Sequence, residues 1–173
     1  MNAVHGQKVG YNNSPPRFTE NGTSRDLMKI LVIHGPNLNM LGKRDPTKYG
    51  TLTIDDIKNQ MQIIASKLDY TIDFFQSNHE GAIIDFLQLE TSRAADGVII
   101  NPGALVRYGY CLRQALIDLG KPTFEVHMSD IDRLGINRSV NVLEDIRIDQ
   151  IAGLKEKSYY EALEKLIKYL EVN

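Results

Sequence analysis

Short apolar runs alternate along the chain with longer segments in which apolar residues recur at helical spacing. The runs have the length of strands and are bounded by turn residues, so each predicts a largely buried strand. The predicted strands cover residues 29–35, 70–76, 97–103, 121–129 and 147–154.

The intervening segments predict helices. In residues 54–68, apolar side chains recur every three or four positions, and Thr53 stands where a helix cap is expected. Gly120 is expected to end one helix and Ser158 to cap another. The predicted helices cover residues 54–68, 80–93, 109–120 and 158–172, whereas residues 136–146 fit neither pattern clearly.

Strands that alternate with helices predict an α/β fold with right-handed crossovers. We expect a flavodoxin-like, doubly wound, five-stranded parallel sheet in a three-layer α/β/α sandwich. Ligands of such sheets bind beyond the carboxyl ends of the strands, which makes that edge the place to look for chemistry.

Residues 1–27 differ from the rest of the chain, because they are polar, contain Pro15 and Pro16 in succession, and lack periodicity. We interpret them as a flexible N-terminal extension, with an arm that docks on a neighbouring subunit as the alternative. Residues 28–173 are expected to form one catalytic domain.

Composition narrows the function classes. The 173 residues carry a net charge of −2, so no general attraction to nucleic acid or to an anionic membrane is expected. Cys111 is the single cysteine, and no apolar run has the length of a membrane span. We therefore expect a cytoplasmic protein, without a secretory signal.

Polar residues gather just after the predicted strands. Because the strands are expected to be parallel, these side chains should meet at one edge of the sheet. They include Asn37, Arg44, Tyr49, Asn101, Arg107, His127, Met128, Ser129 and Arg138. The chain lacks a P-loop, a dinucleotide-binding glycine motif, a nucleophile elbow and histidines at metal-ligand spacing, which leaves proton chemistry on a small anionic molecule.

Two pairs of residues suit proton transfer. A cation such as Arg44 near the Tyr49 phenol would favour the phenolate, which can act as a general base. Glu125 should share a strand face with His127, where a carboxylate can orient an imidazole and hold its proton. The alternative interpretations are a solvated Arg44, a Tyr49 that packs in its loop, and a His127 that belongs to the core.

Four segments resemble the type II 3-dehydroquinate dehydratases, or type II dehydroquinases, over residues 28–170. They are GPNLNMLGKRDPTKYG, FFQSNHEGAIIDFLQ, VIINPGA and PTFEVHMSDI. The resemblance implies a flavodoxin-like fold, a homododecamer built from trimers, and no metal or organic cofactor. The implied reaction converts 3-dehydroquinate to 3-dehydroshikimate by anti elimination through an enolate, in the shikimate pathway or in quinate catabolism.

The resemblance also implies roles by position. Tyr49 would be the base, Arg44 would activate it on a lid of residues 41–50, and Asn37 would hold a water on the enolate. His127, supported by Glu125, would protonate the leaving hydroxyl. The matching substrate-binding positions are Asn101, Arg107, Met128, Ser129 and Arg138, with Met128 acting through its backbone N–H.

Several positions depart from the family pattern. Arg107 stands where the family has a substrate-binding histidine, and Gln114 replaces an aspartate of the following helix. Residues 133–138 keep the last arginine but lose an earlier one and its carboxylates. Two other functions therefore stay open: a paralogue that acts on another hydroxylated keto acid, and a flavodoxin-like binding module without catalysis.

Overall fold

The computed structural model describes residues 27–130 and 140–173 of the 173-residue chain. Its centre is a five-stranded sheet in the order β2-β1-β3-β4-β5, and every neighbouring pair is parallel. The strands are β1 (Met28–His34), β2 (Tyr70–Gln76), β3 (Gly97–Asn101), β4 (Thr123–His127) and β5 (Asp149–Ala152). This order is that of the flavodoxin-like fold and confirms the predicted fold class.

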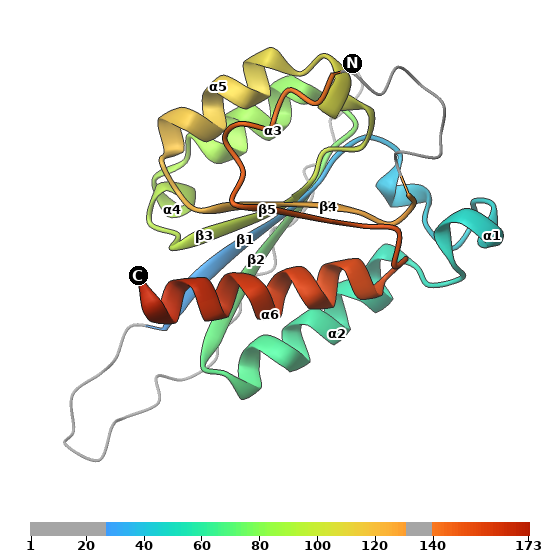
Figure 1. The fold of residues 1–173 in the computed structure, drawn as a ribbon, viewed down its shortest axis with the longest axis horizontal. Coiled ribbons are helices and arrows are strands. Elements are labelled where there is room, and N and C mark those ends of the chain that lie inside the picture. Colours follow the sequence, from blue (N-terminus) through green and yellow to red (C-terminus); the bar gives the residue numbers. More distant parts are fainter. Residues whose placement is uncertain (1–26, 131–139) are drawn as a thin grey trace, which may run out of the picture.

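Helices cover both faces of the sheet (Figure 1). α2 (Ile54–Lys67) and α6 (Lys157–Val172) lie on one face, and α3 (Glu80–Leu87) and α5 (Tyr110–Leu119) lie on the other. The shorter elements are η1 (Leu38–Met40), α1 (Pro46–Tyr49), α4 (Glu90–Arg93) and η2 (Gly103–Arg107).

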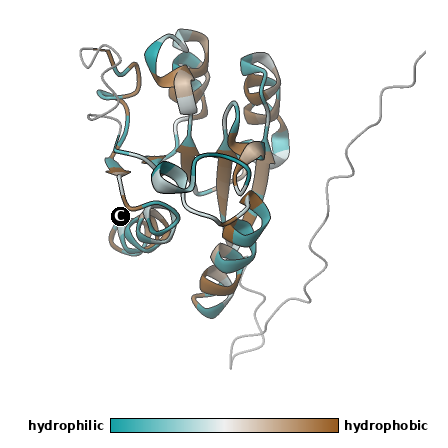
Figure 2. Cartoon of the chain, turned by 90° about the vertical axis from the view of Figure 1, so that its right-hand side faces the viewer, coloured by the Kyte–Doolittle hydropathy of each residue, from teal (hydrophilic) through white to brown (hydrophobic). Residues whose placement is uncertain are grey.

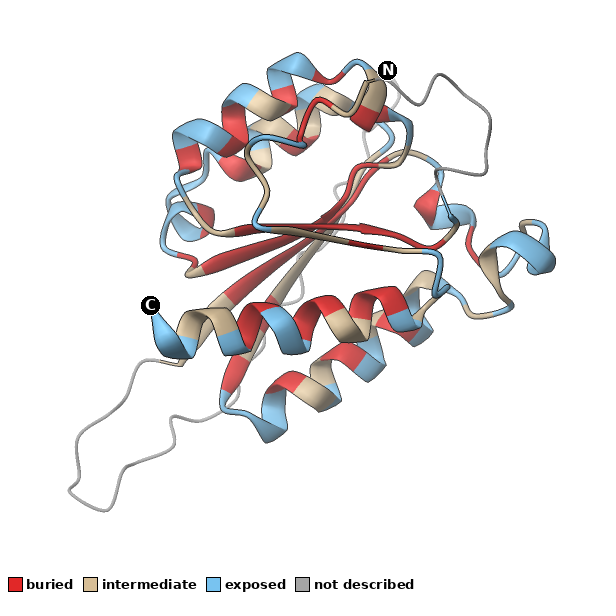
Figure 3. Cartoon of the chain, in the orientation of Figure 1, coloured by how far each residue is buried: buried red, intermediate tan, exposed pale blue. Residues whose placement is uncertain are grey.

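The central strands are apolar on both faces because both faces are covered. In β1, Ile30 and Val32 join the core beneath α2 and α6, whereas Leu31 and Ile33 join the core beneath α3 and α5. All four side chains are fully buried, and Figure 3 shows the buried residues concentrated in the sheet and the inner helix faces. The unbroken apolar runs of the sequence follow from this double coverage.

The strand ends, η1 and α1 lie at one edge of the sheet, which Figure 2 views from outside. Asp45 caps α1, because its side chain accepts a hydrogen bond from the Thr47 N–H at 2.9 Å. Pro46 then occupies the first helical position, where its missing N–H costs nothing. The polar loop after β1 is therefore partly helical and lies at the edge where the sequence predicts a ligand site.

Local signals in the sequence were confirmed at two helices and wrong at two others. Thr53 caps α2 through a capping box with Asp56, and Gly120 ends α5 with φ of 67°. The segment 80–93 is not one helix, because the chain leaves the helical conformation between α3 and α4. Ser158 is not the cap of α6: it lies inside the helix, buried, and its hydroxyl accepts a hydrogen bond from the Leu154 N–H.

Some predictions fall outside the described residues. These are the flexible extension, of which only Leu27 is described, and Arg138. The division into residues 1–27 and 28–173 therefore stays a prediction. In the described part of the chain, no helix has both the length and the apolar character that crossing a bilayer requires.

Candidate active site

The loop after β1 is tied to the neighbouring strands. The Gly35 N–H donates to the Asn101 carbonyl at 2.7 Å, and a Cβ at Gly35 would lie 2.5 Å from the Pro102 oxygen, so only glycine fits there. Asn37 has φ of 68°, and its N–H donates to the Asn78 side-chain oxygen at 2.9 Å. These contacts fix where Asn37 begins the loop that leads to α1.

Arg44 and Tyr49 contact each other as the sequence predicted. The Arg44 guanidinium carbon lies 3.7 Å from the centre of the Tyr49 ring, within the range of a cation–π contact. Both side chains are partly exposed, and Tyr49 packs against the core beneath α2 and α6. The loop thus presents a phenol with a guanidinium against its ring.

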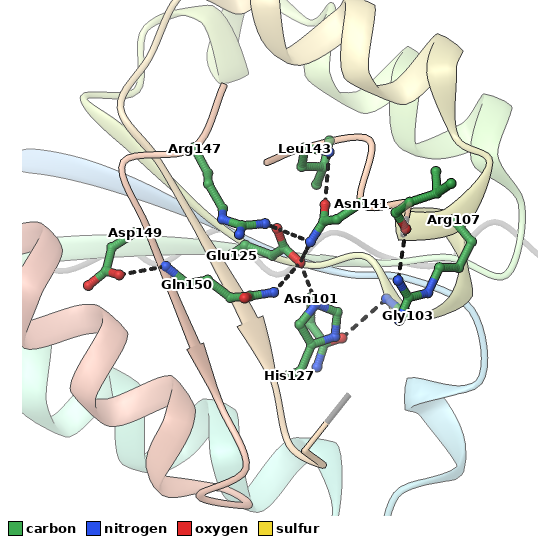
Figure 4. A network of polar contacts seen from close by, with 11 residues as sticks. Asn101, Gly103, Arg107, Glu125, His127, Asn141, Leu143, Arg147, Asp149 and Gln150 are labelled. Carbon is green, nitrogen blue, oxygen red and sulfur yellow. Dashed lines mark hydrogen bonds and ion pairs between the residues drawn. The ribbon is translucent and has the colours of Figure 1, made fainter. Parts of the chain in front are cut away.

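Glu125 and His127 form a second pair, at the end of β4 (Figure 4). His127 Nε2 lies 2.5 Å from Glu125 Oε1. Three more side chains donate to the same carboxylate: Asn141 at 2.9 and 3.2 Å, Gln150 at 2.9 Å, and Arg147 at 2.6 Å. Glu125 is fully buried and His127 nearly so, whereas Asn141, Arg147 and Gln150 are partly exposed, so the carboxylate itself lies out of contact with bulk water.

The network keeps Glu125 charged despite its burial. Burial by itself raises the pKa of a carboxyl group, but the hydrogen bond and charge of His127, the charge of Arg147 and the hydrogen bond from Asn141 lower the pKa of Glu125 overall. Glu125 is therefore a carboxylate at neutral pH and orients the His127 ring.

A second polar network, made of uncharged side chains, lies on the face of the sheet that α2 and α6 cover. His34 Nδ1 lies 2.9 Å from the Tyr159 hydroxyl, and the Asn101 side chain hydrogen bonds the same hydroxyl. Burial, with a smaller effect of Lys58, lowers the pKa of His34 to about 3, and burial raises the pKa of Tyr159. His34 is therefore neutral, and its buried Nε2 has no hydrogen-bond partner among the residues that the structure describes.

The other predicted substrate-binding residues have mixed surroundings. Asn101 is buried, and its Oδ1 accepts from the Gly103 N–H at 3.2 Å. Met128 is buried, whereas Ser129 is partly exposed. Arg107 Nη1 donates to the Val140 carbonyl at 2.8 Å, so this guanidinium lies beside the segment that follows residues 131–139.

The structure thus brings the predicted residues together as two contacting pairs, Arg44 with Tyr49 and Glu125 with His127. Both pairs lie on elements at the carboxyl edge of the sheet, since α1 follows β1 there and β4 ends there. Gln114, which replaces the family's aspartate, donates to Asp118 at 2.8 Å.

Sequence reasoning missed three residues of the network: Asn141, Arg147 and Gln150. Gln150 lies opposite Glu125 in the pairing of β4 with β5, and Arg147 lies just before β5. Gln150 could have been predicted, because it is a polar residue on a strand next to a buried carboxylate. Asn141 could not, because no clear pattern occurs in the segment 136–146. No cluster of three or more His, Cys, Asp or Glu side chains suited to a metal ion occurs within residues 27–130 and 140–173.

The chain is similar to proteins of one known family. The family model described as dehydroquinase class II matches residues 28–167. A protein named 3-dehydroquinate dehydratase from Roseiflexus castenholzii is 51% identical over 140 residues, which are 81% of this chain and 88% of the relative. Another of that name, from Halothermothrix orenii, is 41% identical over 83% of this chain and 96% of its own length.

A solved structure supports the same relationship. The crystal structure of a type II dehydroquinase from Butyrivibrio crossotus superposes with a TM-score of 0.76 at 38% identity, covering 80% of this chain and 97% of that one. Sequence and fold therefore agree over nearly the whole length of these relatives. The chain belongs to the dehydroquinase class II family.

Proposed function

We propose that the protein dehydrates 3-dehydroquinate to 3-dehydroshikimate, using Tyr49 as the base and His127 as the acid. The single observation that carries the proposal is the pair of contacts Arg44–Tyr49 and Glu125–His127 at one edge of the sheet. Elimination of water requires a base that takes a proton from carbon and an acid that protonates the leaving hydroxyl. A phenol beside a cation suits the first role, and an imidazole beside a carboxylate suits the second.

The first step is removal of a proton from the carbon beside the ketone. The Tyr49 phenolate takes this proton, and the electron pair of the C–H bond moves toward the ketone oxygen to give an enolate. Arg44, at 3.7 Å from the ring, stabilises the phenolate before the transfer. Asn37 is proposed to hold a water molecule that donates to the enolate oxygen.

The second step is loss of the hydroxyl group. The enolate oxygen re-forms the ketone, and the electron pair of the enolate C=C bond moves to form the new carbon–carbon double bond. The carbon–oxygen bond of the hydroxyl group breaks, and its electron pair leaves with the oxygen. His127 donates its proton to the departing oxygen, which leaves as water. The Glu125 carboxylate holds the ring in place through the 2.5 Å contact while the proton leaves.

The remaining residues are proposed to hold the substrate. Asn101, Met128, Ser129 and Arg138 match substrate-binding positions of the family, and Arg107 is proposed to contact a ring hydroxyl or the carboxylate. Arg107 keeps its donors although it replaces a histidine, but it cannot accept a hydrogen bond. An oxyanion substrate suits the two arginines, because guanidinium groups bind carboxylates in forked geometry.

The test of the base is Tyr49→Phe. We expect kcat for formation of the conjugated enone, followed by ultraviolet absorbance, to fall by about 10²–10⁴-fold, because the phenolate is lost. The circular dichroism spectrum should be unchanged, since the ring and its packing remain.

The matched control is Tyr110→Phe, which removes the hydroxyl of a phenol that is 64% exposed on α5. This variant should keep wild-type turnover. Full activity of Tyr49→Phe would show that another group is the base, and lack of turnover of 3-dehydroquinate by the wild-type protein would contradict the proposed reaction.

Assembly and location complete the proposal. We propose a trimer-based dodecamer on the strength of the family resemblance, which light scattering of the purified protein tests. A cytoplasmic location is supported by the single cysteine of the chain and is tested by cell fractionation.

A further inference from the structure

The buried carboxylate of Glu125 has more donors than its contact with His127 requires. Of the four described side chains that contact it, Arg147 alone is a permanent cation. Its Nη1 lies 2.6 Å from Oε2, while His127 binds Oε1. Each oxygen of the carboxylate therefore has its own charged or chargeable partner.

Arg147 is held firmly in this position. The backbone N–H of Ile148, the next residue, donates to the Thr123 carbonyl at 2.8 Å, which ties the segment to the start of β4. The Arg147 N–H donates to the Leu143 carbonyl at 3.1 Å. The side chain is only 14% exposed, so the ion pair with Glu125 is largely shielded from water.

The charge of this buried group changes when His127 gives up its proton. With His127 protonated, the side chains of Glu125, His127 and Arg147 together carry two positive charges and one negative charge. After proton release they sum to zero, because the carboxylate and the guanidinium remain. Without Arg147, the same step would leave a buried carboxylate with no compensating charge, which is costly.

We propose that Arg147 is a positioning residue that favours proton release from His127 by keeping the Glu125 carboxylate charge-balanced afterwards. This inference rests on the proposed function, in which His127 is the acid. Arg147 does not need to touch the substrate, since it acts through the carboxylate.

The other charged groups near the network in residues 27–130 and 140–173 have partners of their own. Asp149 pairs with Lys165 of α6 at 3.0 Å on the surface, and Arg107 donates to the Val140 carbonyl. Arg113 of α5 pairs with Asp145 at 2.6 Å. Asn101, at the end of the neighbouring strand β3, is neutral. The balancing charge within the described network is therefore that of Arg147.

The experiment compares Arg147→Met with Arg147→Lys, measuring kcat and KM for 3-dehydroquinate across pH. In Arg147→Met, His127 holds its proton more tightly, so the alkaline limb of the kcat profile should move about one unit upward and kcat should fall about tenfold. KM should change far less than kcat. Arg147→Lys keeps a cation at this position, so both kcat and the position of the alkaline limb should lie close to those of the wild type.

The matched control is Arg113→Met, which removes a guanidinium paired with the same segment but without contact to Glu125. It should leave the profile unchanged. Arg147→Gln serves where Arg147→Met fails to fold, because the amide keeps a donor for Oε2 and removes only the charge. A wild-type profile in Arg147→Met or Arg147→Gln would overturn the inference.

A substrate-free measurement separates this inference from the proposed function. Nuclear magnetic resonance of the histidine rings reads their protonation directly. The His127 ring should stay protonated to higher pH in Arg147→Gln than in the wild type. An identical protonation curve would overturn the inference, whereas absence of wild-type turnover would contradict the reaction alone.

Discussion

Glu125 and His34 are both completely buried near the carboxyl edge of the sheet, yet they are in opposite ionisation states. Four described side chains contact the Glu125 carboxylate, and one of them, Arg147, is a permanent cation. Within the described part of the chain, His34 has one hydrogen-bond partner, Tyr159, and its Nε2 has none. Burial is the same for both, so the partners decide whether the group is charged.

The charge of Glu125 and the neutrality of His34 match the roles proposed for the residues that they contact. The charged group is the one that contacts His127, where a proton is proposed to move. The neutral group contacts Tyr159 and, through it, Asn101, where orientation is needed but no charge. Two polar networks of one sheet edge thus suit different tasks.

Breaking the charged network should have the largest effect on stability. Glu125→Gln keeps the size of the side chain but leaves Arg147 buried without its counter-charge. We expect the free energy of unfolding to fall by about 3–5 kcal/mol, as measured by urea denaturation at pH 7. A loss below about 1 kcal/mol would mean that the guanidinium finds water or another partner, and the comparison with His34 would lose its basis.

The neutral network should show its effect through pH. The pKa of His34 is lowered from 6.5 to about 3 in the folded protein, so only the unfolded chain binds this proton between those values. The stability from a neutral His34 is thus present above pH 6.5 and is lost as pH falls toward 3. Between pH 7 and pH 5 it should contribute a loss of about 2 kcal/mol.

His34→Asn isolates this contribution, because the amide keeps a hydrogen-bonding side chain at this position and does not titrate. The wild type should lose about 2 kcal/mol more than the variant between pH 7 and pH 5 in urea denaturation. The pKa of Glu125 is lowered from its ordinary value of 4.5 by folding, so the stability that this carboxylate contributes is lost only as pH falls below about 4.5. Parallel stability curves for wild type and His34→Asn would refute the neutral assignment.

A surface ion pair next to the network should matter least. Lys165 and Asp149 lie 3.0 Å apart, with side chains 46% and 42% exposed. Lys165→Met should change the free energy of unfolding by less than about 1 kcal/mol, because water screens the pair. A larger loss would show that this pair supports Gln150, whose N–H donates to Asp149 at 2.7 Å.

Much of the fold and one half of the site could be predicted from sequence. The apolar runs predicted the central strands β1, β3 and β4, because strands covered on both faces are apolar on both. The edge strand β5 is less apolar, and its segment gave a weaker signal. The spacing of Glu125 and His127 predicted their contact, since alternate residues of a strand share a face. The break between α3 and α4 was missed, because no Gly or Pro stands at residues 88–89 to mark it.

The sequence by itself determined the strands, their alternation with helices, the edge where polar residues gather and the family resemblance, because these depend on local periodicity and on ordered motifs. Only the tertiary structure decided which side chains converge on Glu125. Asn141, Arg147 and Gln150 lie 16 to 25 positions from it and reach it through the loop and the pairing of β5 with β4. Charge and hydrogen bonding act through space, so the partners of a buried group follow from packing and not from spacing along the chain.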